Sequence, residues 1–232
     1  QDLKISVAAN ASASVSFSPL TVLNANTRAT VKLGGATAAD ALPIDNVFHF
    51  VLTPAAPVPV TVVSQGSADT MLYLSRALAI GEQPKFDASL QSPDGLAGDG
   101  VNRARVMILN DVPVGEPLAT RLAAFVEGGG GLMIATGPRA SWPSGRASWL
   151  PATIGQAVDR TRGAARLSGM DFGHEIFEPF RAPRSGDFST ARYYSYRALA
   201  TAKGASVLAR FDTGEPALVE KAAGRGRVAV YA

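Results

Sequence analysis

The sequence predicts an α/β protein in which a small β-rich, sandwich-like segment precedes a doubly wound, mainly parallel sheet. Residues 3–33 alternate polar and apolar side chains with a period of two, which is typical of strands. Residues 54–59 form a proline-rich connector, the best candidate for a domain boundary. Buried-strand and helical patterns alternate after this connector, which favours parallel strands with right-handed crossovers. We therefore expect a β-rich segment at residues 1–56 and an α/β domain at residues 57–232.

The N-terminal segment is expected to contain four or five strands. The clearest strand patterns lie at 13–17, 29–33 and 47–52, with a turn at Asn24-Ala25-Asn26 between the first two and a polar turn at 40–46 before the third. About fifty-five residues are too few to close an immunoglobulin-like sandwich, which needs about a hundred. Either strands are missing upstream or this sheet packs against its neighbour.

The second segment alternates continuous apolar runs with helical patterns. Strands are expected at 60–64, 86–90, 106–109 and 132–135, and helices from Ser67 or Asp69 to Ile80 and over 116–127. The glycines at 128–131 should end the second helix, because glycine tolerates positive φ. Beyond Gly137 we expect loop and a short helix over 142–154, and then strands at 207–211, 217–221 and 228–231. The last two should form a hairpin through residues 223–226.

Composition excludes several classes of function. The 22 basic and 19 acidic residues are scattered, without the basic run that would follow a nucleic-acid backbone. The absence of cysteine excludes disulfides, thiolate metal sites and thiol nucleophiles. No apolar run reaches the eighteen residues of a membrane span, and the start at Gln1 lacks a signal-peptide pattern. Both ends look cut, so we expect an excised piece of a longer protein that neither inserts into a membrane nor needs a cofactor or metal.

Several motifs together resemble a known fold family. They are Val106-Met107-Ile108-Leu109-Asn110-Asp111-Val112, the glycine run between Phe125 and Ile134, His174-Glu175-Ile176-Phe177-Glu178-Pro179-Phe180, Gly214-Glu215-Pro216-Ala217-Leu218-Val219-Glu220, and Gly224-Arg225-Gly226-Arg227-Val228. Residues 40–232 resemble the class I glutamine amidotransferase-like, flavodoxin-like fold. The likeness is greatest to its version in bacterial membrane-anchored proteins of the aerotolerance-regulator type, which often also carry a von Willebrand factor A domain. The resemblance implies a periplasmic or other extracytoplasmic location.

The residues that such a fold would use for catalysis are missing. Active members carry a cysteine nucleophile on a turn after a strand, backed by histidine and glutamate. The comparable turn here is 134–138, which contains no cysteine, so glutaminase chemistry is excluded. A serine substitute would need Ser141 or Ser144 as nucleophile, His174 as base and Glu175 or Glu178 to orient it, but neither serine lies in a Gly-x-Ser-x-Gly elbow. We therefore expect no catalytic residue.

A ligand site is most plausible at the carboxyl ends of the predicted strands. Open α/β sheets bind ligands there, which selects Asn110, Asp111, Gly137 and Arg139. His174 is added as a further candidate, although a histidine before apolar residues more often caps or packs a turn.

Other polar residues have structural explanations that we prefer. His49 between two phenylalanines should face outward or be satisfied. Asp40, Asp45 and Asn46 offer oxygen ligands for calcium but fit turn chemistry better. Glycines 128–131 precede a strand, where a phosphate loop would precede a helix. Residues 192–197 are rich in tyrosine and arginine, which fits either a protein interface or a strand with Tyr194 buried.

These observations favour a non-catalytic extracytoplasmic interaction or regulatory module of a larger membrane-anchored bacterial protein. Its partner would be another protein or other domains of the same chain, and not nucleic acid. The alternative is a small-molecule-binding or hydrolytic domain that uses the strand-end site around Asn110, Asp111, Gly137 and Arg139. A purely structural spacer has the same sequence signature as the first interpretation.

Overall fold

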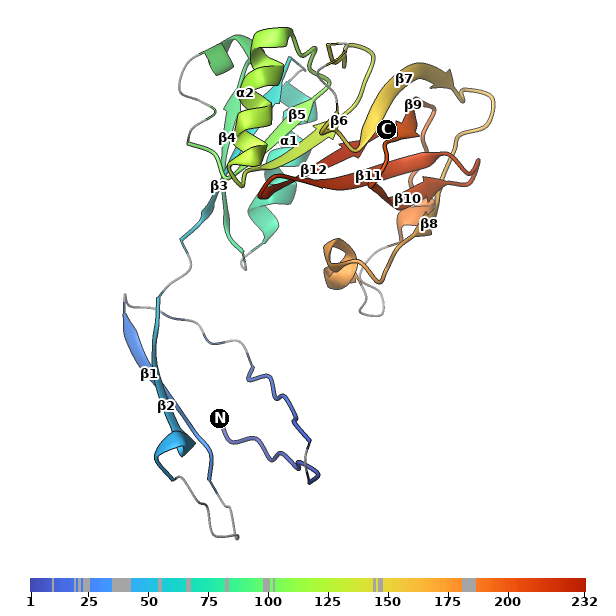
Figure 1. Cartoon of the computed structure of the whole chain (residues 1–232). Coiled ribbons are helices and arrows are strands. Elements are labelled where there is room, and N and C mark those ends of the chain that lie inside the picture. Colours follow the sequence, from blue (N-terminus) through green and yellow to red (C-terminus); the bar gives the residue numbers. More distant parts are fainter. Residues whose placement is uncertain are drawn as a thin grey trace. The chain divides into compact units, whose positions relative to one another are not determined.

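The computed structural model describes residues 1–9, 11–18, 20, 22, 26–34, 43–53, 56–65, 68–81, 84–97, 101, 103–143, 145, 148–180 and 187–232 (Figure 1). The chain divides into two units, Gln1–Ala56 and Pro57–Ala232. Among the described residues, no helix is both long and apolar enough to cross a membrane.

The first unit contains one antiparallel hairpin among its described residues. Strand β1 (Thr27–Lys32) pairs with β2 (Val47–Leu52), so that Val31 lies opposite Phe48 and Ala29 opposite Phe50. A 3-10 helix, Pro43–Asn46, leads into β2. The strand expected at 13–17 does not form, although its alternation is clear. Alternation assigns two faces to a segment, but a strand also needs a hydrogen-bonding partner, and these residues have none within the described part of the unit.

The second unit is mixed α/β and is built on a large, mostly parallel sheet (Figure 1). Its described strands follow the order β4-β3-β5-β6-β12-β11-β10-β8. Strands β4, β3, β5, β6 and β12 run parallel to one another, whereas β11, β10 and β8 are joined by antiparallel pairings. The parallel strands are β3 (Val58–Ser64), β4 (Phe86–Gln91), β5 (Val106–Asn110), β6 (Gly131–Ala135) and β12 (Gly226–Tyr231). The others are β8 (Leu167–Met170), β10 (Ser206–Phe211) and β11 (Pro216–Ala223).

Two helices pack against different sides of this sheet. Met71 of α1 (Ala68–Ile80) belongs to a core cluster with Val60, Val62 and Ile108. Leu122 and Val126 of α2 (Glu116–Glu127) belong to a second cluster, which contains the strand residues Val63, Met107 and Leu109. Neighbouring residues of a strand point to opposite faces, so α1 and α2 cover opposite faces of the parallel half.

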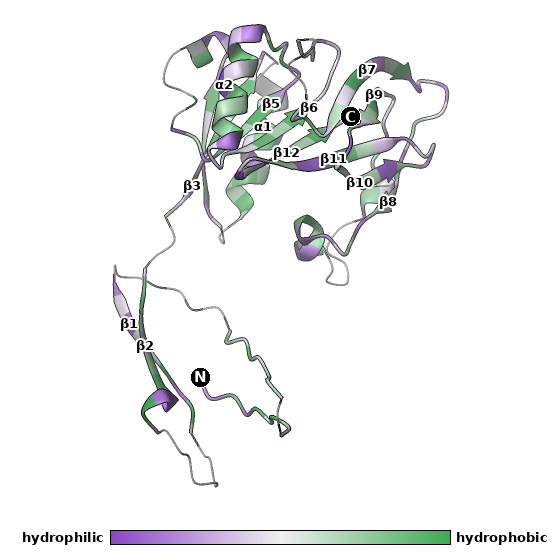
Figure 2. Cartoon of the chain, viewed as in Figure 1, coloured by the Kyte–Doolittle hydropathy of each residue, from purple (hydrophilic) through white to green (hydrophobic). Residues whose placement is uncertain are grey.

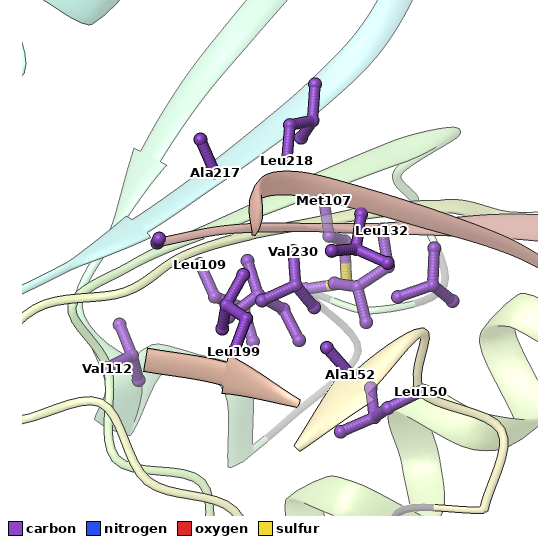
Figure 3. Packing of buried hydrophobic residues seen from close by; sticks show 14 of the residues in the cluster. Met107, Leu109, Val112, Leu132, Leu150, Ala152, Leu199, Ala217, Leu218 and Val230 are labelled. Carbon is purple, nitrogen blue, oxygen red and sulfur yellow. The ribbon is translucent and has the colours of Figure 1, made fainter. Parts of the chain in front are cut away.

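A ribbon of two further strands packs on the α2 side. Strand β7 (Ala152–Asp159) pairs antiparallel with β9 (Ser195–Thr201). The ribbon belongs to the same core as Met107 and Val230 (Figure 3). It contributes Leu150, which precedes β7, Ala152 of β7 and Leu199 of β9. Sequence analysis expected loop and a short helix over 142–154, and did not foresee this ribbon. The pairing of its strands is broken by a bulge between Ile154 and Ala157, which disrupts the period-two pattern.

The tyrosines at the start of β9 bear on a second expectation. Burial of Tyr194 in a strand was one of the two interpretations of residues 192–197, but Tyr194 is 54% exposed, whereas Tyr196 is 4% exposed and stacks on Phe211 with ring centroids 4.2 Å apart. Strand β9 begins at Ser195, so Tyr194 lies just before the strand, and the alternation that would have buried it does not extend to it.

The glycine-rich turns agree with the predictions. Helix α2 ends at Glu127, and Gly129 has φ +109°, as expected for a helix stop. Strands β11 and β12 form the predicted hairpin, with Gly224 at φ +58°. A Cβ on Gly226 would lie 2.2 Å from the Gly130 carbonyl oxygen, so this hairpin packs tightly on the end of α2.

Candidate functional site

Asp111 lies directly after β5, in the left-handed backbone region with φ +53°. Aspartate tolerates this region better than most residues. One carboxylate oxygen accepts hydrogen bonds from the Arg139 N–H at 2.8 Å and the Ala140 N–H at 2.9 Å, and the other accepts from Arg139 Nε at 3.0 Å. The carboxylate thus holds the loop that follows β6.

The same loop is held from its carbonyl side by Arg197 of β9. Arg197 Nη1 donates to the carbonyl oxygens of Gly137 at 3.0 Å and Ala140 at 3.3 Å, while its Nε donates to Gly155 at 2.8 Å. Gly137 is needed because a Cβ there would lie 2.5 Å from Cγ of Asp111. We call the group formed by Asp111, Gly137, Arg139, Ala140 and Arg197 the strand-end clamp.

The structure brings four of the five candidate ligand-binding residues to one edge of the sheet. Asn110 donates from Nδ2 to Ser64 Oγ at 3.3 Å, and Arg139 Nη1 reaches the Gln65 carbonyl oxygen at 3.5 Å. Within the clamp, Asp111 bonds to Arg139 and lies directly against Gly137. Arg197 could not be recognised from the sequence, because its role depends on the β7–β9 ribbon.

Thr136 adds a polar atom to this edge that is not used by the clamp. It lies in the turn directly after β6. Its Oγ1 is buried and has no hydrogen-bond partner among the described residues. A buried hydroxyl without a partner is uncommon and requires an explanation.

His174 contacts a different set of residues. Its Nδ1 accepts the Ile176 N–H at 3.3 Å, and its Nε2 lies 3.0 Å from Glu220. Arg227 joins Glu220 at 2.7 Å and Glu175 at 3.4 Å. Because Nδ1 acts as an acceptor, the neutral ring carries its proton on Nε2 and donates it to Glu220. Both ring nitrogens are therefore engaged.

This arrangement bears on the serine alternative. A base must accept the nucleophile's proton on a free ring nitrogen. The contacts of His174 leave none, and among the described residues no hydrogen bond or ion pair links Glu175 or Glu178 to the ring. Ser144 lies outside the described residues, and Ser141 takes part in a backbone bridge with Pro113.

A second polar network lies between β9 and the β10–β11 turn. Tyr196 and Thr213 both donate to Glu215 Oε2, the latter at 2.6 Å. The hydrogen bonds from Thr213 and Tyr196 hold the pKa of Glu215 below its usual value, while burial is the main cause that raises the pKa of Tyr196. Burial and the Tyr193 hydroxyl raise the pKa of Tyr231 in the same core. These are neutral tyrosines that position strands.

The metal interpretations find little support in the geometry. No group of three or more His, Cys, Asp or Glu side chains within the described ranges could hold a metal ion. Asp45 and Asn46 lie in the 3-10 helix before β2, and Asp40 lies outside the described residues. His49 Nδ1 bonds with Thr30 Oγ1 across the hairpin at 2.9 Å, on an exposed face.

The first unit contains a hollow that sequence analysis did not identify. It has a volume of about 560 Å³ and lies between the N-terminal residues and one face of the β1–β2 hairpin. Its wall includes Phe17, Leu20, Val31, Phe50 and Leu52. The sequence signal for this hollow was the alternation of apolar residues in the N-terminal segment and in the hairpin.

Comparison with known proteins shows a similar fold but no family for this chain. No family model matches the chain, and no curated protein matches it. Among solved structures, a cytoplasmic protein from Salmonella typhimurium is similar over 75% of this chain and 86% of that chain, with 14% identity and a TM-score of 0.57. A GH42 β-galactosidase is similar over 76% of this chain but only 27% of its own, with 14% identity and a TM-score of 0.51.

ThuA-like proteins, which have a class I glutamine amidotransferase-like fold, also appear at low identity. One from Bacteroides uniformis shares 12% identity over 76% of this chain and 82% of its own, with a TM-score of 0.49. A TM-score below 0.5 supports no inference. At these identities the likeness to the first two structures shows a shared fold alone.

Proposed function

We propose that the chain is a non-catalytic extracytoplasmic interaction or regulatory module of a larger membrane-anchored bacterial protein. The observation that carries this proposal is the set of hydrogen bonds that Asp111 accepts. Its carboxylate accepts hydrogen bonds from Arg139 and Ala140 in the loop after β6, so the carboxylate best placed for chemistry serves to hold the strand-end clamp together. The lack of cysteine in the whole sequence supports the same conclusion.

The location and the parent protein rest on the family resemblance alone. In this proposal the second unit is a degenerate, doubly wound amidotransferase-like domain of the aerotolerance-regulator type, and the opposite placement of α1 and α2 supports the doubly wound part. The Salmonella protein with a similar fold is described as cytoplasmic, so location needs its own test.

The β1–β2 hairpin is the surface that we assign to the partner protein. Its face formed by Val31, Phe48, Phe50, Ala29 and Leu52 is apolar, and Phe48 is 67% exposed while stacking on Phe50. Most of β2 is coloured as hydrophobic in Figure 2. Exposed apolar surface of this kind marks sites of protein interaction. Aromatic side chains at such sites supply much of the binding free energy.

Cross-linking in the native membrane fraction tests the proposal. The full chain should yield a defined cross-linked protein, and Phe48→Asp should abolish the product. Val51→Asp is the matched control, because Val51 is 58% exposed on the opposite face of the hairpin. Loss of the product in both variants, or no product at all, would contradict the assigned surface. Recovery of the chain with the cytoplasmic fraction would contradict the location.

A small-molecule-binding or hydrolytic function remains the second candidate because of Thr136. Its buried hydroxyl, which has no hydrogen-bond partner among the described residues, lies in the turn directly after β6 and is a feature of this edge that a ligand could satisfy. A thermal-shift screen against metabolites, sugars, nucleotides and divalent metals tests this, since a ligand of the folded state raises its apparent stability. A hit lost in Thr136→Val would favour this candidate, whereas a flat screen would favour the interaction module.

A further inference from the structure

Helix α1 is apolar on the side that faces solvent as well as on the side that faces the sheet. Met71 is buried in the core, whereas Leu72, Tyr73 and Ile80 are 44%, 77% and 80% exposed. At 100° per residue these three fall within one arc of the helix, and Arg76 is the charged side chain among them. Much of α1 is accordingly coloured as hydrophobic in Figure 2. A helix that is apolar all round is normally buried.

Strand β4 lies beside α1 at the end of the strand order. Within the described residues β4 pairs with β3, and its other edge has no strand partner. Leu90 is opposite Val62 in the parallel register, so it lies on the α1 face of the sheet, where it is 53% exposed. An open edge next to exposed apolar side chains is a template for pairing with another strand.

We propose that a second copy of this chain occupies this edge, with β4 pairing antiparallel to the partner's β4 across a twofold axis at Ala88. A twofold interface uses the same surface on both copies and therefore must be self-complementary. An axis perpendicular to the sheet keeps the α1 faces of both copies on the same side. The exposed face of α1 and the partner subunit's α1 then flank the junction.

The register centred on Ala88 is complementary on both faces of the sheet. On the α1 face, Phe86 lies opposite the partner's Leu90, and the small Ala88 side chains meet at the axis. On the other face, Asp87 lies opposite the partner's Ser89, and Lys85 lies opposite the partner's Gln91. No like charges are directly opposed, and an aromatic residue meets an aliphatic one, which are the pairings that stabilise antiparallel strands. A slip of one residue would place apolar side chains against the polar face.

Disulfide trapping tests the register. The sequence contains no cysteine, so Ala88→Cys introduces a single thiol. Directly opposed residues of antiparallel strands have Cα atoms about 4.5 to 5.5 Å apart, within the range of a disulfide. Ala88→Cys should therefore form a covalent dimer on mild oxidation. Ser89→Cys is the control. In this register its thiol would lie opposite the partner's Asp87, and the two introduced thiols would lie diagonally across the junction instead of directly opposite each other.

Light scattering coupled to gel filtration tests the association itself. The wild-type chain should give twice the monomer mass of 24.0 kDa. Ile80→Glu should give the monomer mass with an unchanged circular dichroism spectrum, because Ile80 is largely exposed in the single chain. Tyr194→Glu, at an exposed tyrosine away from α1, should remain dimeric. A monomeric wild-type chain, or equal oxidation of the Ala88→Cys and Ser89→Cys variants, would overturn the proposal.

Discussion

Replacing Asp111 by alanine should destabilise the second unit by about 3 to 6 kcal/mol. The change removes two hydrogen bonds from backbone N–H groups to a carboxylate, which together contribute roughly 2 to 4 kcal/mol after allowance for partial exposure. The contact with Arg139 adds about 1 kcal/mol at most, because the arginine side chain is 46% exposed. Alanine at φ +53° adds about 1 kcal/mol of backbone strain.

Two matched variants separate these contributions. Asp111→Gly loses the same hydrogen bonds without the strain at positive φ, so it should be about 1 kcal/mol more stable than Asp111→Ala. Asp111→Asn keeps a side-chain oxygen for the two N–H groups and a residue type suited to this backbone region, so it should lose only about 1 kcal/mol. Urea unfolding with an unchanged m-value gives the three free energies. A loss below about 1 kcal/mol for Asp111→Ala, or equal stability of the alanine and glycine variants, would refute the clamp.

The remaining predictions concern the neighbours of this clamp and the buried tyrosine network. Gly137→Ala should destabilise by about 1 to 3 kcal/mol through steric overlap with the aspartate, whereas Gly163→Ala, which has open space around it, should change stability by less than about 1 kcal/mol in the same unfolding assay. Arg197→Met should lower the free energy of unfolding by about 2 to 4 kcal/mol, since three carbonyl oxygens lose their hydrogen-bond donor. An unchanged free energy of unfolding would show that water replaces the arginine as donor. Tyr196→Phe should lower stability at neutral pH by about 1 kcal/mol. The pKa of Glu215 is lowered in the folded state, so the stability from this carboxylate is present above its unfolded pKa and is lost as pH falls through its folded pKa. The difference between wild type and Tyr196→Phe should therefore shrink in acid, and a constant difference would contradict this account.

The parallel half of the sheet could be predicted from the sequence because each of its elements has a strong local signal. Continuous apolar runs identified β3, β5 and β6, and the apolar spacing identified α2 to the residue. Each apolar run identifies its strand without information from the adjacent segments, and the glycines after α2 mark the end of that helix. The same logic located Asp111 and Gly137 at strand ends.

The β7–β9 ribbon and the state of the first unit could not be predicted in this way. Strand β7 is interrupted by a bulge, and its partner β9 follows about thirty-five residues later, so neither carries a pattern that identifies the other. Arg197 could not be assigned to the clamp without that pairing. Residues 13–17 show the opposite case, in which a clear alternation lacks the partner that would make it a strand.

The position of β12 has a consequence for the order in which the sheet can be assembled. This strand lies between β6, to which it is parallel, and β11, to which it is antiparallel, and it is synthesised after every other strand of the sheet. The 90 residues between β6 and β12 take roughly 5 to 20 s to emerge from a ribosome. During that time the edge of β6 that β12 later covers is open, and the two halves of the sheet have no hydrogen bonds to each other. The nascent chain therefore passes through a state in which this edge is exposed to chaperones and to other chains.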